Sequence, residues 1–301
     1  MASDVKERRG IWPATLETYS EFSDDNAMTF AASLAFYTGL AIAPLLTIAV
    51  WIARNVVGGG AADRIVSGFT EVMGPQAAES IRQLIDPASS QADQGMTISG
   101  LISIGILLFS ASGVFVELQT ALNWLWDVRQ KPDEGVWGYV QKRVLSFGML
   151  LALLFVLLVS GVLSAVVQAL ITGNGEGWWM QIVSAVVSLV LFVPLFALLF
   201  KYIPDARIGW GDVWVGATIT AALFVLGKLL LGLYLGRADY GSSYGAAVGS
   251  FVVLLVWVYY SSIIVFVGAE ATQVYARRQG HAVEPSQHAE RIRQRVEAVP
   301  A

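Results

Sequence analysis

Three of the charged side chains in the long apolar stretches of this chain could do chemistry, because burying a charge there is costly and such a side chain often serves a function. Glu117 and Glu270 each lie toward one end of an apolar stretch, and Lys228 lies deep inside another. If the two carboxylates meet, they can hold a proton or a cation between them. The lysine can bind an anionic group or pair with a carboxylate. Other readings stay open, since a glutamate near an interface reaches water or caps a helix, and a lysine extends along its own stem toward the interface.

Smaller polar side chains recur at helical spacing in three of the apolar stretches, which places them on one face of each expected helix. Asn26, Ser33 and Tyr37 follow one another at the start of the first stretch, Asn123 lies in the second and Tyr259 in the last. Polar faces of this kind usually border protein or water rather than lipid. The candidates for a substrate or ion pathway are therefore Asn26, Ser33, Tyr37, Pro44, Glu117, Asn123, Lys228, Tyr259 and Glu270.

Six apolar stretches must position these residues, and each is long enough to cross the roughly 30 Å hydrocarbon core of a bilayer as a helix. The composition agrees, because 55% of the residues are hydrophobic, only 14% are charged and the mean hydropathy is +0.61. A soluble domain of this size needs more charge. We therefore expect an all-α, polytopic integral membrane protein with six transmembrane helices. The expected helices span 32–57, 98–122, 144–171, 178–201, 212–235 and 247–271.

Basic residues predict the orientation of these helices, because Lys and Arg gather in short segments on the cytoplasmic side of the membrane. The segments before the first helix, between the second and third, between the fourth and fifth, and after the sixth together carry 14 of the 19 Lys and Arg residues. We therefore expect both termini in the cytoplasm. The polar faces would then form a vestibule that opens to the cytoplasm.

The chain divides into a cytoplasmic or interfacial arm, a transmembrane domain and a cytoplasmic tail. Within the domain, an insert over 59–96 carries two apolar stripes at helical spacing, separated by Gly74-Pro75. This pattern predicts two short amphipathic helices in the first outer loop. They either lie on the bilayer and pad the bundle or form a lid over a cavity. The tail forms a short helix or no regular structure. The arm, domain and tail cover 1–31, 32–274 and 275–301.

Two further patterns concern helix shape and packing. Pro44 and Pro194 interrupt the first and fourth apolar stretches. Broken helices at matching positions are typical of transporters built from two inverted halves, and two ordinary proline kinks are the alternative. The Gly232/Gly236 pair suits close helix packing, either within one molecule or between copies in a homo-oligomer.

The composition also excludes several functions. A net charge of −4 and a pI near 5.2 argue against a nucleic-acid partner, which requires a concentrated basic surface. The chain has no cysteine, and its two histidines, His281 and His288, lie in the polar tail. No metal centre and no catalytic base are therefore expected within the spans. We expect no enzyme and no cofactor, and we expect membrane lipids as the partners.

Four segments carry a resemblance to a known family. They read AASLAFYTGLAIAPLLTIAV at 31–50, LQTALNWLWDV at 118–128, KYIPDARIGWGDVWVGA at 201–217 and YGAAVGSFVVLLVWVYYSSIIVFVGAE at 244–270. In this order they resemble the YihY/virulence factor BrkB family, over nearly all of the membrane part but not the arm or the tail after about 280.

The resemblance implies a bacterial inner-membrane protein with six spans, for which transport of lipid-like or other amphipathic molecules is a reasonable proposal. Some members of this family have been labelled as the tRNA-processing ribonuclease BN. Zinc-dependent nucleases need several His and Asp ligands, and this chain has no such cluster in its sequence, so we reject that activity.

Two functions therefore stay open. A transporter or flippase would use the polar faces around Tyr37, Glu117 and Glu270 as an inner vestibule, with Lys228 attracting an anionic headgroup on the outer side. A non-transporting scaffold of the envelope would use the same polar residues to join helices by hydrogen bonds. In the first case, Glu117→Gln or Lys228→Ala abolishes transport and leaves the protein folded. In the second case, folding is lost together with any activity.

Overall fold

The computed structural model describes residues 10–57, 61–92, 113–131, 178–235, 246–281, 283–286 and 289–292, and this part of the chain is mostly helical. The helices are α2 (Ile11–Asp24), α3 (Ala27–Val57), α4 (Ala61–Met73), α5 (Pro75–Ala92), a helix over 113–125, α8 (Trp178–Tyr202), α9 (Trp210–Leu235) and α11 (Ala246–Arg278). The strands are β1 (Val128–Gln130), β2 (Ala206–Arg207), β3 (Glu284–Pro285) and β4 (Ala289–Arg291).

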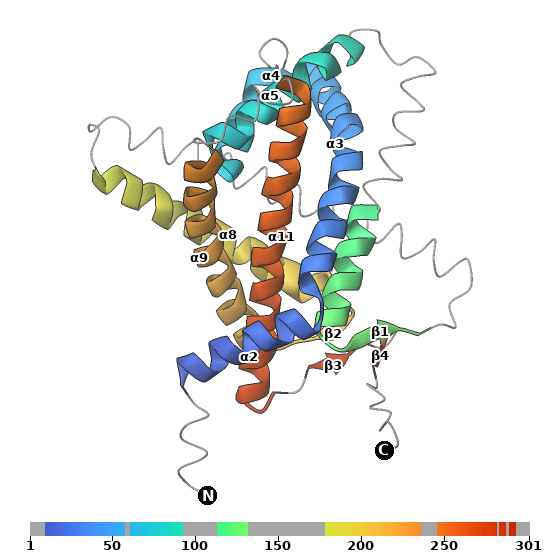
Figure 1. The fold of residues 1–301 in the computed structure, drawn as a ribbon, viewed down its shortest axis with the longest axis vertical. Helices are drawn as coiled ribbons and strands as arrows, with labels where there is room; N and C mark the ends of the chain where they lie inside the picture. Colours follow the sequence, from blue (N-terminus) through green and yellow to red (C-terminus); the bar gives the residue numbers. More distant parts are fainter. Residues whose placement is uncertain are drawn as a thin grey trace, which may run out of the picture.

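Helix α11 runs through the middle of the bundle, between α9 and α3 (Figure 1). It begins near α4 and α5 and ends near α2, which lies across the opposite end of the bundle together with the strands (Figure 1). The α8 helix packs against α9. We call the end that carries α2 and the strands the α2 end.

Three of the described helices are long and apolar enough to cross a membrane, and α3 carries a shorter apolar segment over Ala27–Ile42. Large aliphatic side chains on α9 are exposed, with Leu226 at 54%, Leu229 at 58% and Leu233 at 60%. Several large apolar side chains exposed along one helix are typical of a membrane or protein contact, and on a helix of membrane length they suit contact with lipid. The membrane-length segments are Ala185–Tyr202, Trp210–Leu231 and Val248–Arg278.

Four of the six predicted spans can be compared with described helices. The span predicted over 32–57 lies within α3, the fourth and fifth nearly coincide with α8 and α9, and the sixth is shorter than α11. The second is described only from residue 113, and the third, over 144–171, lies outside the described residues. Helix α3 continues through Pro44 and α8 continues through Pro194, so neither proline ends its helix.

The insert over 59–96 contains α4 and α5, which meet at Gly74. Gly74 has a φ of 87°, a left-handed conformation that favours glycine. The apolar faces of the two helices are buried, with Met73 at 3%, Ile81 at 0% and Ile85 at 1% exposure. They pack against Leu46 of α3 and against side chains of α9 and α11. The two helices therefore pad one end of the bundle.

Helices α9 and α11 approach each other closely through a reciprocal pair of small residues. A Cβ added to Gly216 of α9 would overlap Thr272 of α11, and one added to Gly268 of α11 would overlap Thr220 of α9. Each threonine hydroxyl donates back to the glycine carbonyl of its own helix, from Thr220 to Gly216 at 2.8 Å and from Thr272 to Gly268 at 2.7 Å. These four residues fix the position of α11 near the α2 end.

The described part of the tail forms strands, which the sequence analysis did not anticipate. Strand β4 pairs antiparallel with β1, with Val128 opposite Arg291, and β3 pairs antiparallel with β2, with Ala206 opposite Pro285. An ion pair of 2.7 Å between Arg129 Nε and Glu290 Oε1 supports the first pairing. The chain after α11 therefore folds back onto two connections of the bundle.

Candidate functional site

Three carboxylates from separate segments converge at the α2 end. Glu21 of α2, Asp25 of the link between α2 and α3, and Glu270 of α11 place one oxygen each within 4.8 Å of the others. Glu270 has 0% exposure, and no N–H or hydroxyl group among the described residues donates to its carboxylate oxygens. We call these three residues the acid cluster. It brings together negative charges that neighbouring donors do not fully stabilise.

The backbone between α2 and α3 determines how Asp25 enters the acid cluster. Helix α2 ends at Asp24, and the Asp25 amide donates to the carbonyl of Glu21 at 2.9 Å. Asn26 follows with a φ of 54°, a conformation that Asn tolerates better than most residues. Its carbonyl accepts the Thr29 amide at 2.8 Å in the first turn of α3. Asn26, a predicted pathway residue, is exposed and forms the turn that positions Asp25.

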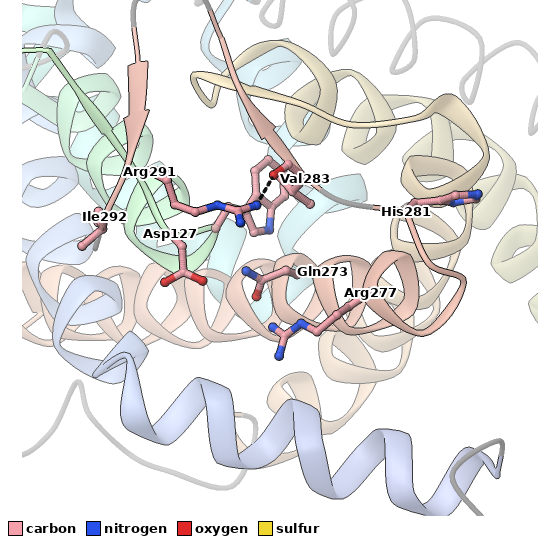
Figure 2. Close-up of a pocket in the computed structure, with 8 residues that line it drawn as sticks. Asp127, Gln273, Arg277, His281, Val283, Arg291 and Ile292 are labelled. Atoms are coloured by element: carbon pink, nitrogen blue, oxygen red, sulfur yellow. Dashed lines mark hydrogen bonds between the residues drawn. The ribbon is translucent and has the colours of Figure 1, made fainter. Parts of the chain in front are cut away.

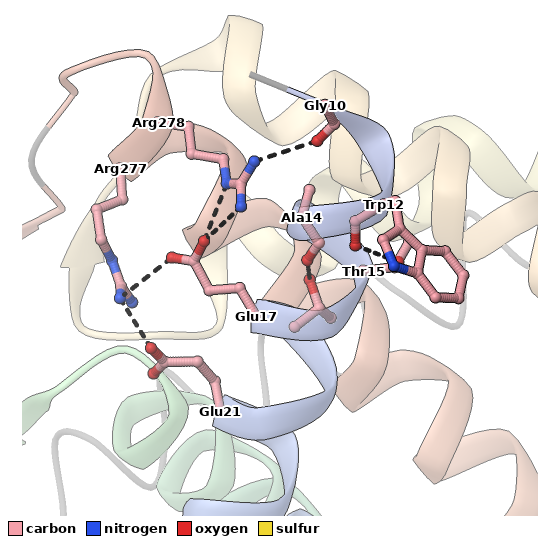
Figure 3. A network of polar contacts seen from close by, with 9 residues as sticks. Gly10, Trp12, Ala14, Thr15, Glu17, Glu21, Arg277 and Arg278 are labelled. Carbon is pink, nitrogen blue, oxygen red and sulfur yellow. Dashed lines mark hydrogen bonds and ion pairs between the residues drawn. The ribbon is translucent and has the colours of Figure 1, made fainter. Parts of the chain in front are cut away.

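Two arginines at the end of α11 hold α2 by ion pairs (Figure 3). Arg277 Nη1 lies 2.8 Å from Glu21 Oε1 and 3.7 Å from Glu17 Oε1. Arg278 contacts the second Glu17 oxygen, with Nη2 at 2.7 Å and Nε at 3.0 Å. It also donates to the carbonyl of Gly10 at 3.3 Å. Charge-assisted bonds of this kind are stronger than neutral ones, so they hold α2 to α11 together with the burial of Phe22 in the apolar core.

Burial raises the pKa of the Asp25 carboxyl from its ordinary value of 3.8 to about 6. A hydrogen bond with Glu270 opposes this shift, whereas the charges of Asp127, Glu21 and Asp24 add to it. Two carboxyl groups share a hydrogen bond only when one of them carries the proton. Because this bond lowers the pKa of Asp25, the ionised Asp25 carboxylate accepts it and the Glu270 carboxyl donates. Burial also raises the pKa of Asp127.

A cavity of about 370 Å³ opens beside the acid cluster. Asp127, Gln273, Arg277, His281 and Arg291 contribute its polar side chains (Figure 2). Arg277 connects the cavity to the acid cluster, because it lines the cavity and its guanidinium binds Glu21. The arrangement places two guanidinium groups, which suit an anionic group, next to carboxylates that suit a proton or a cation.

Trp126 forms a buried wall of this cavity and fixes it to α11. The side chain is 1% exposed, and its Nε1 donates to the carbonyl of Ala269 at 3.1 Å. The next residue, Asp127, has a φ of 55°, which turns the chain from the 113–125 helix into β1.

Among the predicted site residues, Asn123 belongs to a second polar cluster. Its Nδ2 donates to Asp205 Oδ2 at 2.9 Å, and its Oδ1 accepts the Asp205 amide at 2.7 Å. Gln130 Nε2 donates to the same carboxylate at 2.8 Å. These bonds attach the connection between α8 and α9 to the 113–125 helix and to β1.

The two glutamates that the sequence analysis paired have different surroundings. Glu270 lies in the acid cluster, whereas Glu117 is only partly buried. No hydrogen bond or ion pair joins them in the described part of the chain. Tyr37, by contrast, lies against the second predicted span, because a Cβ on Gly113 would meet its ring at 3.0 Å.

The remaining candidates are distributed along the bundle. Ser33 on α3, Lys228 on α9 and Tyr259 on α11 are each partly buried, and Pro44 lies within α3. Tyr259 packs against the main apolar core. The structure places none of these four in the acid cluster, so their part in a pathway stays a prediction.

His281 has a partner that sequence reasoning missed. Its Nδ1 lies 3.0 Å from the carboxylate of Asp212, which is 4% exposed in the first turn of α9. The segment that follows α11 is therefore attached to α9. His288 lies outside the described residues.

Glu21 and Asp25 are the functional candidates that sequence reasoning missed. They are four residues apart, a spacing that places both on one side of a helical turn. Acidic residues just before an apolar stretch look like solvated charges, and their approach to Glu270 depends on contacts between segments far apart in the chain. The i, i+4 spacing was the available signal.

The long apolar helices, the lipid-suited surface of α9 and the buried charge in α11 define an α-helical membrane protein. The chain belongs to the virulence factor BrkB family, whose model matches residues 18–293. The match includes the second half of α2 and both tail strands. The sequence analysis placed these segments outside the resemblance, and that boundary was wrong.

Curated relatives are similar over most of this chain. It is 28% identical over 271 residues to a UPF0761 membrane protein of Delftia acidovorans. This alignment covers 87% of this chain and 62% of the relative. It is 29% identical over 268 residues to a UPF0761 membrane protein of Teredinibacter turnerae, and this alignment covers 87% of this chain and 61% of the relative. The chain thus spans about three-fifths of the length of these relatives. No solved structure matches it.

Proposed function

We propose that this protein is a transporter or flippase of the bacterial inner membrane that moves a lipid-like or other amphipathic, anionic molecule. Six helices would span the membrane, and both termini would lie in the cytoplasm, as the distribution of Lys and Arg predicts. The α2 end would then face the cytoplasm. The alternative is a non-transporting scaffold that supports the envelope.

The observation that carries the proposal is Glu270. It is fully buried in a membrane-length helix, and no N–H or hydroxyl group among the described residues donates to its carboxylate oxygens. Ionisable groups in such helices usually mark a path for an ion or a substrate, because an unsatisfied charge in hydrocarbon is costly. A scaffold needs only satisfied interhelical bonds, of the kind that Asn123 makes with Asp205.

The adjoining cavity supports an anionic substrate. Arg277 and Arg291 line it, with Arg277 also bound to Glu21 and Arg291 Nη2 donating to the carbonyl of Val283 at 2.9 Å, and Trp126 provides an apolar wall. A headgroup that carries a phosphate or carboxylate would pair with the arginines. Lys228 on α9 would attract the same headgroup at a later stage of its path.

A flux assay tests the proposal. The full chain is reconstituted into liposomes that contain fluorescent phosphatidylglycerol or, as a zwitterionic comparison, fluorescent phosphatidylcholine, and transfer between leaflets is followed by dithionite quenching. We expect the protein to move the anionic probe faster than the zwitterionic one. We expect Glu270→Gln to slow transfer at least tenfold while the protein remains folded.

Asp63→Asn is the matched control, because it also neutralises one carboxylate. Asp63 of α4 forms an exposed ion pair with Arg82 of α5, away from the acid cluster. It should leave transfer unchanged. Transfer equal to that of protein-free liposomes would count against the proposal. Loss of folding in step with loss of transfer in Glu270→Gln would favour the scaffold.

A further inference from the structure

The acid cluster has more negative charge than its neighbours neutralise. Arg277 pairs with Glu21 at 2.8 Å, and Arg278 is engaged with Glu17. Three carboxylates and one guanidinium leave a local charge of about −2 when all groups are ionised. Asp127 lies near enough to Asp25 to add to this negative potential. A single divalent cation would neutralise the excess.

The geometry and the chemistry of the donors fit such an ion. The three contributing oxygens all lie within 4.8 Å of one another. Oxygens on opposite sides of a Ca²⁺ ion, bound at about 2.3–2.6 Å, are about 4.6–5.2 Å apart, so the three oxygens fit within one coordination shell. Carboxylate oxygens without nitrogen or sulfur donors select hard cations such as Ca²⁺, Mg²⁺ and Mn²⁺.

A second observation points to a ligand independently of the clustering. Glu270 is fully buried, and no N–H or hydroxyl group among the described residues donates to its carboxylate oxygens, so the polar partner it has is another acid, Asp25. A carboxylate that only joins helices would accept bonds from nearby donors. The Oε1 atom of Gln273, one turn further along α11, is also buried without a partner in the described part. The end of α11 thus presents several oxygen acceptors that lack donors.

We propose that Glu21, Asp25 and Glu270 bind one hard divalent cation, which joins α2 and the link after it to α11. The ion would connect three segments that are separate in the chain, in addition to the ion pairs of Arg277 and Arg278. The proposal does not rest on transport, because the ion has a role in holding α2 whether or not the protein moves a substrate.

Mn²⁺ binding to the purified full chain in detergent tests the site, since free Mn²⁺ gives a sharp paramagnetic resonance signal that disappears on binding. We expect one Mn²⁺ per chain, displaced by Ca²⁺ or Mg²⁺, at concentrations up to about 1 mM, the weak end of protein Ca²⁺ sites. Glu270→Gln and Asp25→Asn should each weaken binding at least tenfold. Asp63→Asn and Glu290→Gln, which remove carboxylates from other ion pairs, should leave it unchanged.

Thermal unfolding of the same samples distinguishes loss of the cation site from loss of the fold. Ca²⁺ should raise the midpoint of the wild type and of Asp63→Asn but not that of Glu270→Gln, while all three unfold cooperatively in EDTA. Failure of the wild type to bind Mn²⁺, or equal binding by Glu270→Gln, would overturn the proposal. So would a cluster that responds to pH alone and not to the metal. A failed flux assay with intact Mn²⁺ binding would leave this site standing and remove only the transport function.

Discussion

Helix α11 is held on one side by shape and at its end by charge. Along α9 it approaches so closely that Gly216 and Gly268 leave no room for a side chain. At the α2 end its contacts are ion pairs from Arg277 and Arg278 to α2, beside the buried carboxylate of Glu270. Contacts of the first kind depend on packing and are insensitive to pH and salt, whereas those of the second kind respond to both.

The difference indicates which part of the molecule can move. Separating α9 from α11 would expose two backbones in close contact and leave voids in the core. Lifting α2 would break these ion pairs and expose one buried side chain, Phe22 at 5%, whereas most of α2 is already exposed, with Leu16 at 53% and Tyr19 at 71%. We therefore interpret α9 and α11 as a rigid base. We interpret α2 as a strap, meaning a segment whose attachment to α11 depends on pH, salt and cations.

The largest effect is expected where shape holds the helices. Gly216→Ala places a methyl group where Thr272 lies, and the contact includes the Thr272 backbone, so rotation of the threonine cannot relieve it. We expect a loss of about 2 kcal/mol in the free energy of unfolding, as in other overpacked sites. Gly211→Ala on the same helix is the control, since a Cβ there has nothing within 4 Å. Equal unfolding midpoints for the two variants would contradict the rigid base.

The attachment of α2 can be measured by labelling a single introduced cysteine, because the chain has no cysteine of its own that would react. Phe22 on α2 is 5% exposed, so a Phe22→Cys thiol should react slowly with a maleimide. Adding Arg278→Met removes the bonds to Glu17, and we expect labelling to become about tenfold faster, since charged hydrogen bonds contribute about 1.5–3 kcal/mol.

A Tyr19→Cys thiol serves as the control for intrinsic reactivity. Tyr19 is already 71% exposed, so Arg278→Met should not change its labelling rate. If the Phe22→Cys rate also stays constant, α2 is held by something other than these ion pairs.

Ionisation of Asp25 should make the stability of the α2 end depend on pH, unlike the packing of α9 against α11. Because burial raises its pKa to about 6, the folded state binds this proton more tightly than the unfolded state, whose value is near 3.8. Wild-type stability is therefore lost as the pH rises from about 4 to about 6 and stays low above that. Asp25→Asn, which cannot ionise, escapes this loss.

In EDTA, Asp25→Asn should match the wild type near pH 4 and exceed it by roughly 1 kcal/mol near pH 7, after allowance for partial exposure. Glu21, Asp24, Asp127 and Glu270 are the acids that face Asp25, and they stay in place in both proteins. Thermal unfolding at the two pH values measures the difference. A constant offset between the proteins would show that Asp25 is not the titrating group.

Much of the helical architecture was predictable, because long apolar stretches are a local signal. The predicted spans over 178–201 and 212–235 nearly coincide with α8 and α9, and the insert contains two helices that meet at Gly74. The strands of the tail were not predictable. Segments of two or three residues such as Glu284–Pro285 carry no period of their own and are strands only because they pair with distant loops.

The candidate site was predictable only in part, for a related reason. Glu270 attracts notice within its own apolar stretch, but its partners lie some 250 residues earlier in the chain, in Glu21 and Asp25. Helical spacing assigns a residue to a face, and it does not say which helix that face meets. Glu117 had an equally good local signal, and the structure places it outside the acid cluster.

The smallest effect is expected at the end of the bundle opposite α2, where charge is exposed. Arg82 pairs with Asp63 between α5 and α4, and the two side chains are 48% and 72% exposed. Solvent screens such a pair, so Arg82→Met should change the free energy of unfolding by less than about 0.5 kcal/mol. Packing of Met73, Ile81 and Ile85 would still hold the two helices in place. A larger loss, measured by thermal unfolding, would show that charge matters at both ends of α11 and would remove the contrast on which the strap interpretation depends.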